Sequence, residues 1–510
     1  MLRKLFRFLF SRYTISALMI AAEIGLLLYL IISMSAYSIV FLVEVMIVNA
    51  MVLIAIINAD YNPEYRVSWV AAVLLLPIFG ALLYVLFHGH GMRRREEMLA
   101  KNAMLTLNKL DECGMDADVL SQNDEVACGK ARAILSVDPT AAIYRGVSRY
   151  YPSGEQLYED MLRALRGAGR YIFLEYFIIE RGEMWNGILE VLKEKVKSGV
   201  EVRVIFDDIG CMKKLPHNYE RTLNSFGIQA LRFSPASPRV SSVHNNRDHR
   251  KICIVDGEIA FTGGVNLADE YINRAERFGH WKDGGVSVRG DAVAGFVKMF
   301  LTMWEMNSRH DGDFDDYLPK CKEKLSDSGF YIPFGSGPSP LYPAKVGKRA
   351  IIDIINQATR YVYITTPYLI IDFDLTSALI GAEERGVDVR IITPGVADKK
   401  MVKVMTKSSY PKLIGAGVRI FEYTPGFIHE KLLVSDDKYC IIGTINLDYR
   451  SLVHHFEDAL WIYGSPTVSE ARDSFLETEK LSHEVTASEA KLNFFEVCVK
   501  CMLGIFAPLL

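Results

Sequence analysis

A nineteen-residue pattern occurs twice in this chain, and no other feature of the sequence restricts the fold as strongly. HRKICIVDGEIAFTGGVNL begins at His249 and HEKLLVSDDKYCIIGTINL begins at His429, with histidine, lysine, aspartate and asparagine at the same spacing. About 0.04 matches to HxKxxxxD are expected by chance, so two matches indicate a duplication. RYIFLEYFII and SGVEVRVIFDD are echoed in the same way by RYVYITTPYLII and RGVDVRIITPG. The chain is therefore expected to contain two homologous halves.

The soluble part of the chain, from about residue 142 to residue 483, alternates strand-like runs with helical stretches. This alternation favours an α/β sandwich in each half. After each motif histidine, the apolar run KICIV or KLLV predicts a buried strand. Side chains two positions apart share a face of a strand, so His249 and Lys251 are expected to point the same way, as are His429 and Lys431. Turn residues follow each strand and predict a hairpin that presents each motif.

Two histidines, two lysines and two asparagines that converge between the halves suit a phosphodiester substrate. One imidazole can attack phosphorus while the other protonates the departing oxygen, because the ordinary pKa of histidine is near 6.5. The lysines and the amides of Asn266 and Asn446 are expected to bind the phosphate oxygens and stabilise developing charge. The backbone at Gly264 and Thr444 is placed in the same phosphate-binding set, although a Gly-Gly pair more often only marks a bend. This chemistry requires no metal.

An imidazole in such a site usually has a carboxylate on its other nitrogen. The candidates are Asp283 in HWKDGGVSV and Glu457 in HHFEDALWI. We expect Asp283 to orient His249 and Glu457 to orient His429. Alignment of the two tails pairs Asp283 with Asp458 instead, and the sequence leaves this mismatch open.

Asp256 and Asp436 end the two motif strands next to turn residues, where aspartate is more often structural than chemical. The residues alone favour a structural role for both and leave a chemical role open. Further histidines near the motifs do not recur between the halves and are expected to be surface or supporting residues: His244, His280, His454 and His455.

Three apolar runs occupy most of the first ninety positions, at residues 15–34, 37–57 and 67–87. Each is long enough to cross about 30 Å of hydrocarbon as a helix, whereas a secretory signal peptide has a shorter apolar core. We therefore expect an uncleaved, multi-pass membrane anchor. Basic clusters precede the first run and follow the third, and both favour the cytoplasm, which three full spans cannot satisfy. Either the second run is re-entrant or interfacial, or the first cluster is overruled; the catalytic body is expected to be cytoplasmic.

The charge and cysteine content narrow the function further. With 58 basic and 61 acidic side chains the net charge is -3, which argues against a nucleic-acid partner because phosphate backbones call for a basic surface. Of eight cysteines, only Cys498 and Cys501 have CxxC spacing, and no second pair or following histidine completes a zinc set. The cysteines are expected to be reduced thiols, and no metal site is predicted.

The paired HxKxxxxD motifs, followed by GGxN and GTxN, are similar to those of the phospholipase D superfamily. With the apolar N-terminal runs, the EYFIIERG and HWKDGGV segments and the APLL terminus, the chain resembles the bacterial cardiolipin synthases of that superfamily. The resemblance covers nearly everything except residues 93–139.

This resemblance implies that one phosphatidylglycerol donates its phosphatidyl group to a second, giving cardiolipin and glycerol. It implies phosphatidylglycerol and membrane lipid as partners and no cofactor. Precedent in the family favours a phosphatidyl-histidine intermediate on His249, with His429 as acid and then base. The catalytic residues carried onto this sequence are His249, Lys251, Asp256, His429, Lys431 and Asp436.

The expected organisation places the site at the interface of two halves. Residues 1–92 form a membrane anchor of two or three transmembrane helices, and residues 93–140 form a linker. Residues 141–335 and 336–485 form the first and second phospholipase D-like α/β halves. Residues 486–510 form an apolar tail that lies at the membrane interface or, as an equal alternative, packs against the body.

Two alternatives remain open at this stage. The same motifs serve a phospholipase D-type hydrolase, or a phosphatidyltransferase that uses another alcohol, because the choice depends on water exclusion and on room for a second lipid. A non-catalytic membrane protein that binds anionic lipid is disfavoured because both motifs are intact.

Overall fold

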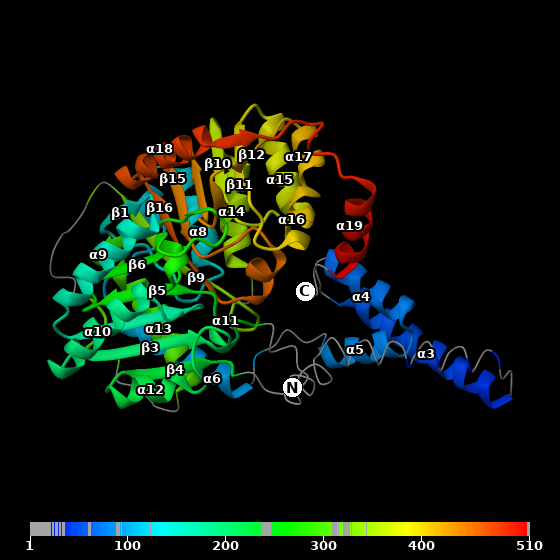
Figure 1. Cartoon of the computed structure of the whole chain (residues 1–510), viewed down its shortest axis with the longest axis horizontal. Coiled ribbons are helices and arrows are strands. Elements are labelled where there is room, and N and C mark those ends of the chain that lie inside the picture. The colour runs from blue at the N-terminus through cyan, green and yellow to red at the C-terminus, as the bar shows by residue number, and fades with distance from the viewer. Residues whose placement is uncertain are drawn as a thin grey trace. The chain divides into compact units, whose positions relative to one another are not determined.

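The computed structural model describes residues 36–59, 63–87, 92, 94–121, 124–235, 246–308, 314, 316–319, 327, 329–342 and 344–506, together with the single residues 22, 25, 29 and 32. The chain divides into an N-terminal apolar unit and a larger body that comprises residues 91–238 and 243–500. Figure 1 shows the body as two sheets covered by helices, with α3, α4 and α5 in the N-terminal unit.

The N-terminal unit contains α3 (Ala36–Asn58), α4 (Pro63–Leu75) and α5 (Phe79–Phe87). Within the described residues, α3 is the one helix that is long and apolar enough to cross a membrane. It carries the second predicted run, and its large apolar side chains point outward: Ile39, Val40, Met46, Ile47, Met51, Ile54 and Ile57. The first predicted run lies outside the described residues except at four single positions.

The third apolar run does not form one helix. It is interrupted around Pro77, which has no backbone N–H, and the chain then doubles back so that the rings of Trp69 and Tyr84 lie 5.4 Å apart. Gly80 lies against the carbonyl of Ala72, where a side chain would clash. Because a 13-residue helix such as α4 extends only about 20 Å, the prediction that this run crosses the bilayer as one helix was wrong.

The first half of the body is built on a seven-stranded sheet in the order β1-β8-β6-β5-β2-β3-β4. Its strands are β1 (Val147–Tyr151), β2 (Tyr171–Tyr176), β3 (Glu201–Asp207), β4 (Gln229–Phe233), β5 (Lys251–Val255), β6 (Ile259–Gly263) and β8 (Gly285–Arg289). β2, β3 and β4 are parallel, whereas β5 runs antiparallel to β2 and forms a hairpin with β6.

The second half has an eight-stranded sheet in the order β17-β12-β11-β10-β14-β15-β16-β9. Its strands are β9 (Phe330–Ser336), β10 (Tyr361–Thr365), β11 (Asp388–Pro394), β12 (Arg419–Tyr423), β14 (Leu432–Ser435), β15 (Tyr439–Gly443), β16 (Glu457–Tyr463) and β17 (Ser482–Glu484). Seven strands of each sheet follow the same order, with β1-β8-β6-β5-β2-β3-β4 matching β9-β16-β15-β14-β10-β11-β12. This match confirms the two homologous α/β halves.

Helices cover both faces of the sheets, so the strands are apolar on both sides. The first half carries α9 (Gly154–Gly167), α10 (Glu183–Lys197), α11 (Asp208–Cys211), α12 (Tyr219–Ser225) and α13 (Val293–Asn307), and the second carries α14 (Val346–Gln357), α15 (Phe373–Glu384), α16 (Lys400–Lys407), α17 (Tyr410–Gly415) and α18 (Pro466–Lys480). Along β2, Ile172 and Leu174 belong to one hydrophobic cluster and Phe173 to another, larger one. The larger cluster includes residues of both sheets, so the two halves share a core.

Two segments lie differently from the expected boundaries. β9, whose residues up to 335 were assigned to the first half, pairs with β16 of the second. The expected linker instead contains α6 (Arg94–Leu110), α7 (Asp118–Ser121) and α8 (Glu125–Leu135), of which α6 packs on α13 and α8 on α14. Lys298 of α13 forms a buried ion pair with Asp111 at 2.7 Å, which ties this segment to the body.

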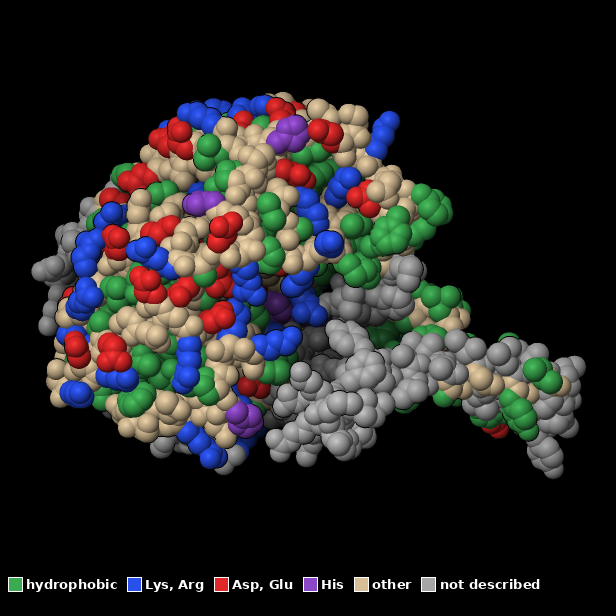
Figure 2. Space-filling view, viewed as in Figure 1, with side chains coloured by type: hydrophobic (Ala, Val, Ile, Leu, Met, Phe, Trp, Pro, Cys, Tyr) green, Lys and Arg blue, Asp and Glu red, His purple; other side chains and the backbone are tan. Residues whose placement is uncertain are grey.

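The remaining elements are the paired short strands β7 (His280–Lys282) and β13 (Gly426–Ile428), the 3₁₀ helix η2 (Asp269–Ile272), the π-helix η3 (Arg450–His454) and the C-terminal helix α19 (Phe494–Phe506). Figure 2 shows basic and acidic side chains interspersed over the visible face of the body. Cys113 is disulfide-bonded, so the expectation that every cysteine is a thiol was wrong there, because spacing does not show which distant cysteines meet. The free cysteines in the described residues are Cys128, Cys211, Cys253, Cys440, Cys498 and Cys501.

Candidate functional site

Both motif histidines immediately precede the motif strands, beyond the carboxyl ends of the neighbouring parallel strands. His249 precedes β5, whose Lys251 pairs with Tyr176 at the end of β2. In the second half, β14 begins at Leu432, opposite Thr365 at the end of β10. The site therefore lies at the edge where open α/β sheets usually bind ligands.

The backbone of each histidine is bound to the other half. The His249 amide donates to the carbonyl of Phe456 at 2.9 Å, and the His429 amide donates to the carbonyl of Lys282 at 2.8 Å. These two hydrogen bonds are related by the pseudo-symmetry of the duplication. They fix both histidines at the interface of the halves, as the sequence predicted.

The side chains of the two histidines are also held across the interface. His249 Nδ1 lies 2.9 Å from Glu457 Oε2, and His429 Nδ1 lies 2.8 Å from Asp283 Oδ2. Asp283 and Glu457 are thus the carboxylates beside the imidazoles, but the expected pairing was wrong. The reason is that β6, β8, β15 and β16 of the two halves pack against one another, which turns each carboxylate toward the partner half.

The sheet register also resolves the alignment mismatch. Gly263 pairs with Gly285 in the first half and Gly443 pairs with Ala459 in the second. Asp283 and Glu457 each lie two residues before these partners and therefore occupy equivalent positions. Asp458 lies one residue before Ala459 and is therefore not equivalent to Asp283. Its carboxylate accepts hydrogen bonds from the Thr262 hydroxyl and the Lys251 amide instead.

The electrostatics of the pairs favour neutral imidazoles and ionised carboxylates. Burial lowers the pKa of His249 to about 3 and that of His429 to about 4. Burial opposes ionisation of Asp283 and Glu457, but the neighbouring histidines outweigh it and the pKa of both carboxyls is lowered. An ionised carboxylate only accepts hydrogen bonds, so each Nδ1 carries the proton and each Nε2 keeps its lone pair for chemistry.

The two motif lysines are equally buried. Lys251 Nζ donates to the carbonyl of His249 at 2.7 Å, and Lys431 Nζ donates to the carbonyl of His429. Burial lowers the pKa of Lys251 to about 8 and that of Lys431 to about 7. An ammonium has three N–H groups, so each lysine retains donors for an anion bound beside the histidines.

The two asparagines differ in their contacts. Asn266 Oδ1 accepts from the Ile178 amide at 3.0 Å, and its Nδ2 donates to the Tyr271 hydroxyl at 2.7 Å. Asn446 Oδ1 is buried and has no hydrogen-bond partner among the described residues. Asn266 is thus largely committed to the scaffold, whereas Asn446 retains an unused polar atom.

The predicted phosphate contacts from Gly264 and Thr444 are contradicted by the geometry. Their amides donate to the carbonyls of Gly284 and Asp458, within the sheets. The Thr444 hydroxyl donates to Glu457 Oε2 at 2.5 Å, and a side chain at Gly264 would collide with Asp283. Both residues therefore support the orienting carboxylates, a role that spacing alone does not distinguish from phosphate binding.

Asp256 and Asp436 lie at the far ends of the motif strands. Asp256 accepts hydrogen bonds from the amides of Gly169, Arg170 and Tyr171, and Asp436 accepts from those of residues 359–361. Each aspartate lies seven positions after its histidine along a largely extended segment, a separation of about 23 Å. Both fix the turn before the first parallel strand, so the catalytic role implied by the family motif is contradicted and the structural reading agrees with the geometry.

His455, which was expected to be a surface or supporting residue, lies in the site and is not on the surface. It is 8% exposed, and its ring centroid lies 5.5 Å from that of His249. Its position two residues before Glu457 was the available signal, since side chains two apart on an extended segment share a face. His244 lies outside the described residues.

Comparisons with known proteins agree with this architecture. A family model described as cardiolipin synthase, PLD-like domain, matches residues 161–278 and 351–478, one segment in each half, and a model described as phospholipase D-nuclease N-terminal matches residues 47–88. The chain is 40% identical to an uncharacterized protein of Streptococcus mutans, over 89% of this chain and 98% of that protein. It is 30% identical to a cardiolipin synthase of Geobacillus kaustophilus, over 92% and 94% of the two chains.

A second cardiolipin synthase, from Alkalihalophilus pseudofirmus, is 29% identical over 93% of each chain. Among solved structures, the phosphatidylserine synthase of Haemophilus influenzae Rd KW20 superposes with a TM-score of 0.57 at 16% identity, over 75% of this chain and 98% of that chain. This last likeness concerns the fold.

Proposed function

The chain belongs to the cardiolipin synthases of the phospholipase D superfamily, and from this membership we propose that it transfers the phosphatidyl group of one phosphatidylglycerol to a second, releasing glycerol. It is a membrane protein and a phosphatidyltransferase of the phospholipase D type. The observation that carries the proposal is the pair of crossed histidine–carboxylate contacts beside two buried lysines.

In the first step, Nε2 of His249 attacks phosphorus of the donor lipid. The P–O bond to the terminal glycerol breaks, and His429 gives its proton to the departing oxygen. Burial keeps His429 neutral at rest, but the negative charge of a bound phosphodiester favours its protonation. Lys251 and Lys431 stabilise the charge that develops on the phosphate oxygens, and Asn446 is proposed to assist them.

In the second step, the terminal hydroxyl of another phosphatidylglycerol attacks the phosphatidyl-histidine. His429, now neutral, accepts the hydroxyl proton, and the P–N bond to His249 breaks. The products are cardiolipin and glycerol. As they leave, His429 releases to solvent the proton that it took up when the donor lipid bound, and the free enzyme is restored. The four side chains supply the nucleophile, the acid and the charge stabilisation, so no cofactor enters this scheme.

The location of the body is part of the proposal. The N-terminal unit anchors the protein as a multi-pass membrane segment, with the body on the cytoplasmic side near the basic residues 93–95. Phe494 and Phe495 at the start of α19 are 85% and 73% exposed, which supports an interfacial role for the tail. A catalytic body held in this way meets lipid head groups.

The test uses purified full-length protein and phosphatidylglycerol vesicles, with products separated by thin-layer chromatography. Cardiolipin and glycerol in equal amounts are expected. Phosphatidic acid as the sole lipid product would show that the protein is a hydrolase and not a synthase. A product formed only with an added alcohol would identify a different acceptor. Intact protein without turnover on any of these substrates would leave lipid binding as its role.

A further inference from the structure

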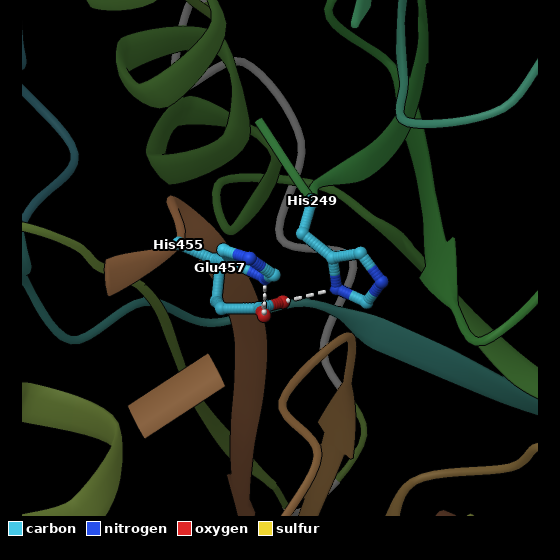
Figure 3. Close-up of side chains that lie close together, drawn as sticks. All are labelled: His249, His455 and Glu457. Carbon is cyan, nitrogen blue, oxygen red and sulfur yellow. Dashed lines mark hydrogen bonds and ion pairs between the residues drawn. The ribbon is translucent and has the colours of Figure 1, made fainter. Parts of the chain in front are cut away.

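His455 breaks the symmetry of the duplicated site. Both of its ring nitrogens are buried and have no hydrogen-bond partner among the described residues, and the same is true of Glu457 Oε1. Figure 3 shows Glu457 between the two imidazoles, with one oxygen toward each. Glu457 Oε2 lies 2.9 Å from His249 Nδ1, and Oε1 lies 3.7 Å from His455 Nδ1.

This arrangement has the composition and size of a transition-metal site. His249, His455 and Glu457 each offer a ligand atom, and the three atoms lie within 4.8 Å of one another. A tetrahedral zinc ion with bonds of about 2.0–2.1 Å holds its ligand atoms about 3.4 Å apart. The ligand atoms here lie within 4.8 Å of one another, so binding an ion would draw them together by about 1 Å, and two imidazoles with one carboxylate form a common zinc ligand set that leaves a fourth position open.

The corresponding position in the first half cannot serve a metal. Trp281 lies two residues before Asp283, as His455 lies two before Glu457, and its ring is 5.7 Å from that of His429. An indole nitrogen is a hydrogen-bond donor only and carries no lone pair for a metal. The duplication therefore yields one such cluster, beside the histidine assigned as nucleophile.

We propose that His249, His455 and Glu457 bind one zinc-class divalent ion, and that this ion inhibits phosphatidyl transfer. An ion bound at Nδ1 of the neutral His249 imidazole displaces the ring proton to Nε2. Nε2 then has no lone pair with which to attack phosphorus. The ion also takes the Glu457 carboxylate, which otherwise stabilises the imidazole as it becomes cationic. The inhibitory effect rests on the proposed transfer reaction, whereas the binding site does not.

The binding test uses Co²⁺ as a spectroscopic substitute for zinc, on full-length protein in which Cys498 and Cys501 are replaced by serine to remove competing thiols. One equivalent of Co²⁺ is expected to give the visible absorption of a tetrahedral site. His455→Trp, which copies the first half, should weaken this binding at least about tenfold, because even residues that only support a metal ligand contribute about 10–100-fold. His455→Gln provides a smaller change, and thermal unfolding verifies that both variants fold.

His483→Gln is the matched control, because His483 also contacts a glutamate but lies exposed on the surface. This control should bind Co²⁺ as the parent does. Equal Co²⁺ affinity in the parent and both His455 variants would overturn the site. Because this readout needs no lipid, it remains decisive even if the protein fails to make cardiolipin.

The activity test measures transfer between phosphatidylglycerol molecules at increasing Zn²⁺. Zn²⁺ should inhibit the parent, EDTA should restore it, and the residual activity of His455→Gln should require at least about ten times more Zn²⁺ for the same fractional loss. Stimulation by Zn²⁺, or equal inhibition of parent and variant, would overturn the inhibitory role.

Discussion

At the scale of single residues, the two orienting carboxylates can be distinguished experimentally because each contacts a different catalytic imidazole. Glu457→Gln should slow attack by His249, and Asp283→Asn should slow proton transfer by His429, each by about 10²–10⁴. A phosphatidyl-nitrophenol donor distinguishes them, because its leaving group departs without a proton. With this donor, labelling of the enzyme should stay slow in Glu457→Gln and approach the parent rate in Asp283→Asn; the reaction is quenched with denaturing detergent at alkaline pH, where a P–N bond to histidine persists.

Asp473→Asn, at an exposed position, controls for the loss of one negative charge. Peptide mapping should place the label on His249. The opposite response of the two variants, together with label on His429, would exchange the roles of the histidines.

The lysines predict a pH dependence with a definite sign. Because burial lowers the pKa of Lys431 to about 7 and that of Lys251 to about 8, both are cationic below these values and lose charge above them. His429 must be protonated to act as the acid and its pKa is about 4, so kcat/KM already declines with pH above 4. Loss of the lysine charges should make this decline steeper as pH rises through 7–8. Lys431→Arg keeps its charge throughout this range, so the steeper part of its decline should begin nearer pH 8, with the remaining titration of Lys251.

Lys431→Ala should lose about 10²–10³ in rate below pH 7, the typical effect of removing a donor to developing charge, and less at higher pH, where the lysine of the parent is itself uncharged. The exposed Lys438→Ala is the control. If the steeper decline of kcat/KM occurs over the same pH range in the parent and in Lys431→Arg, it is caused by the titration of another group.

Residue identities were the part of the site that the sequence predicted best. The repeated spacing identified His249, His429 and both lysines, and the segment tails contained Asp283 and Glu457. Their pairing was not predictable from spacing, because it depends on how the two halves pack. For the same reason Thr444 and Gly264 were interpreted as phosphate contacts, although their neighbours are the carboxylates of the site.

At the scale of elements, the aspartates that close the motif hairpins should affect stability rather than chemistry. Asp436→Ala leaves three amides near the start of β10 without their acceptor and should lower the free energy of unfolding by about 1–3 kcal/mol. Asp256→Ala should behave alike. The measurement is denaturant unfolding in detergent, with activity per folded molecule determined well below the transition.

Glu258→Ala, an exposed change in the β5–β6 turn, should alter neither quantity. If Asp436→Ala lost most of its turnover with unchanged stability, Asp436 would have a catalytic role.

Strands were predicted correctly where a short apolar run is followed by turn residues, as in KICIV and KLLV, whereas the helices of the expected linker were not predicted. The segment 93–140 has a mixed composition that suggested a linker, yet Ala100, Ala103 and Leu107 of α6 are buried against the body. Burial of this kind depends on a partner helix far along the chain. Pro77 lies at the break between α4 and α5 and was a signal for it. Because residues 67–87 are apolar throughout, they were nevertheless predicted to form one helix.

At the scale of the whole molecule, the crossed contacts require one active site rather than two. His249→Ala and His429→Ala should each lose at least about 10³ in turnover, and the double variant should be no worse than the weaker single one, because residues that act as a unit are not additive. Rates with phosphatidylglycerol vesicles test this directly. Retention of about half the activity in either single variant would indicate two independent sites.

The crossed contacts also affect when activity arises during synthesis. His249 emerges from the ribosome 208 residues before Glu457, a delay of about 10–40 s at usual elongation rates. Until the second half is made and docked, the first half holds an imidazole without its carboxylate and a carboxylate without its imidazole. A nascent chain next to the bilayer therefore does not react with the surrounding lipid, and activity begins only when both halves are folded and docked.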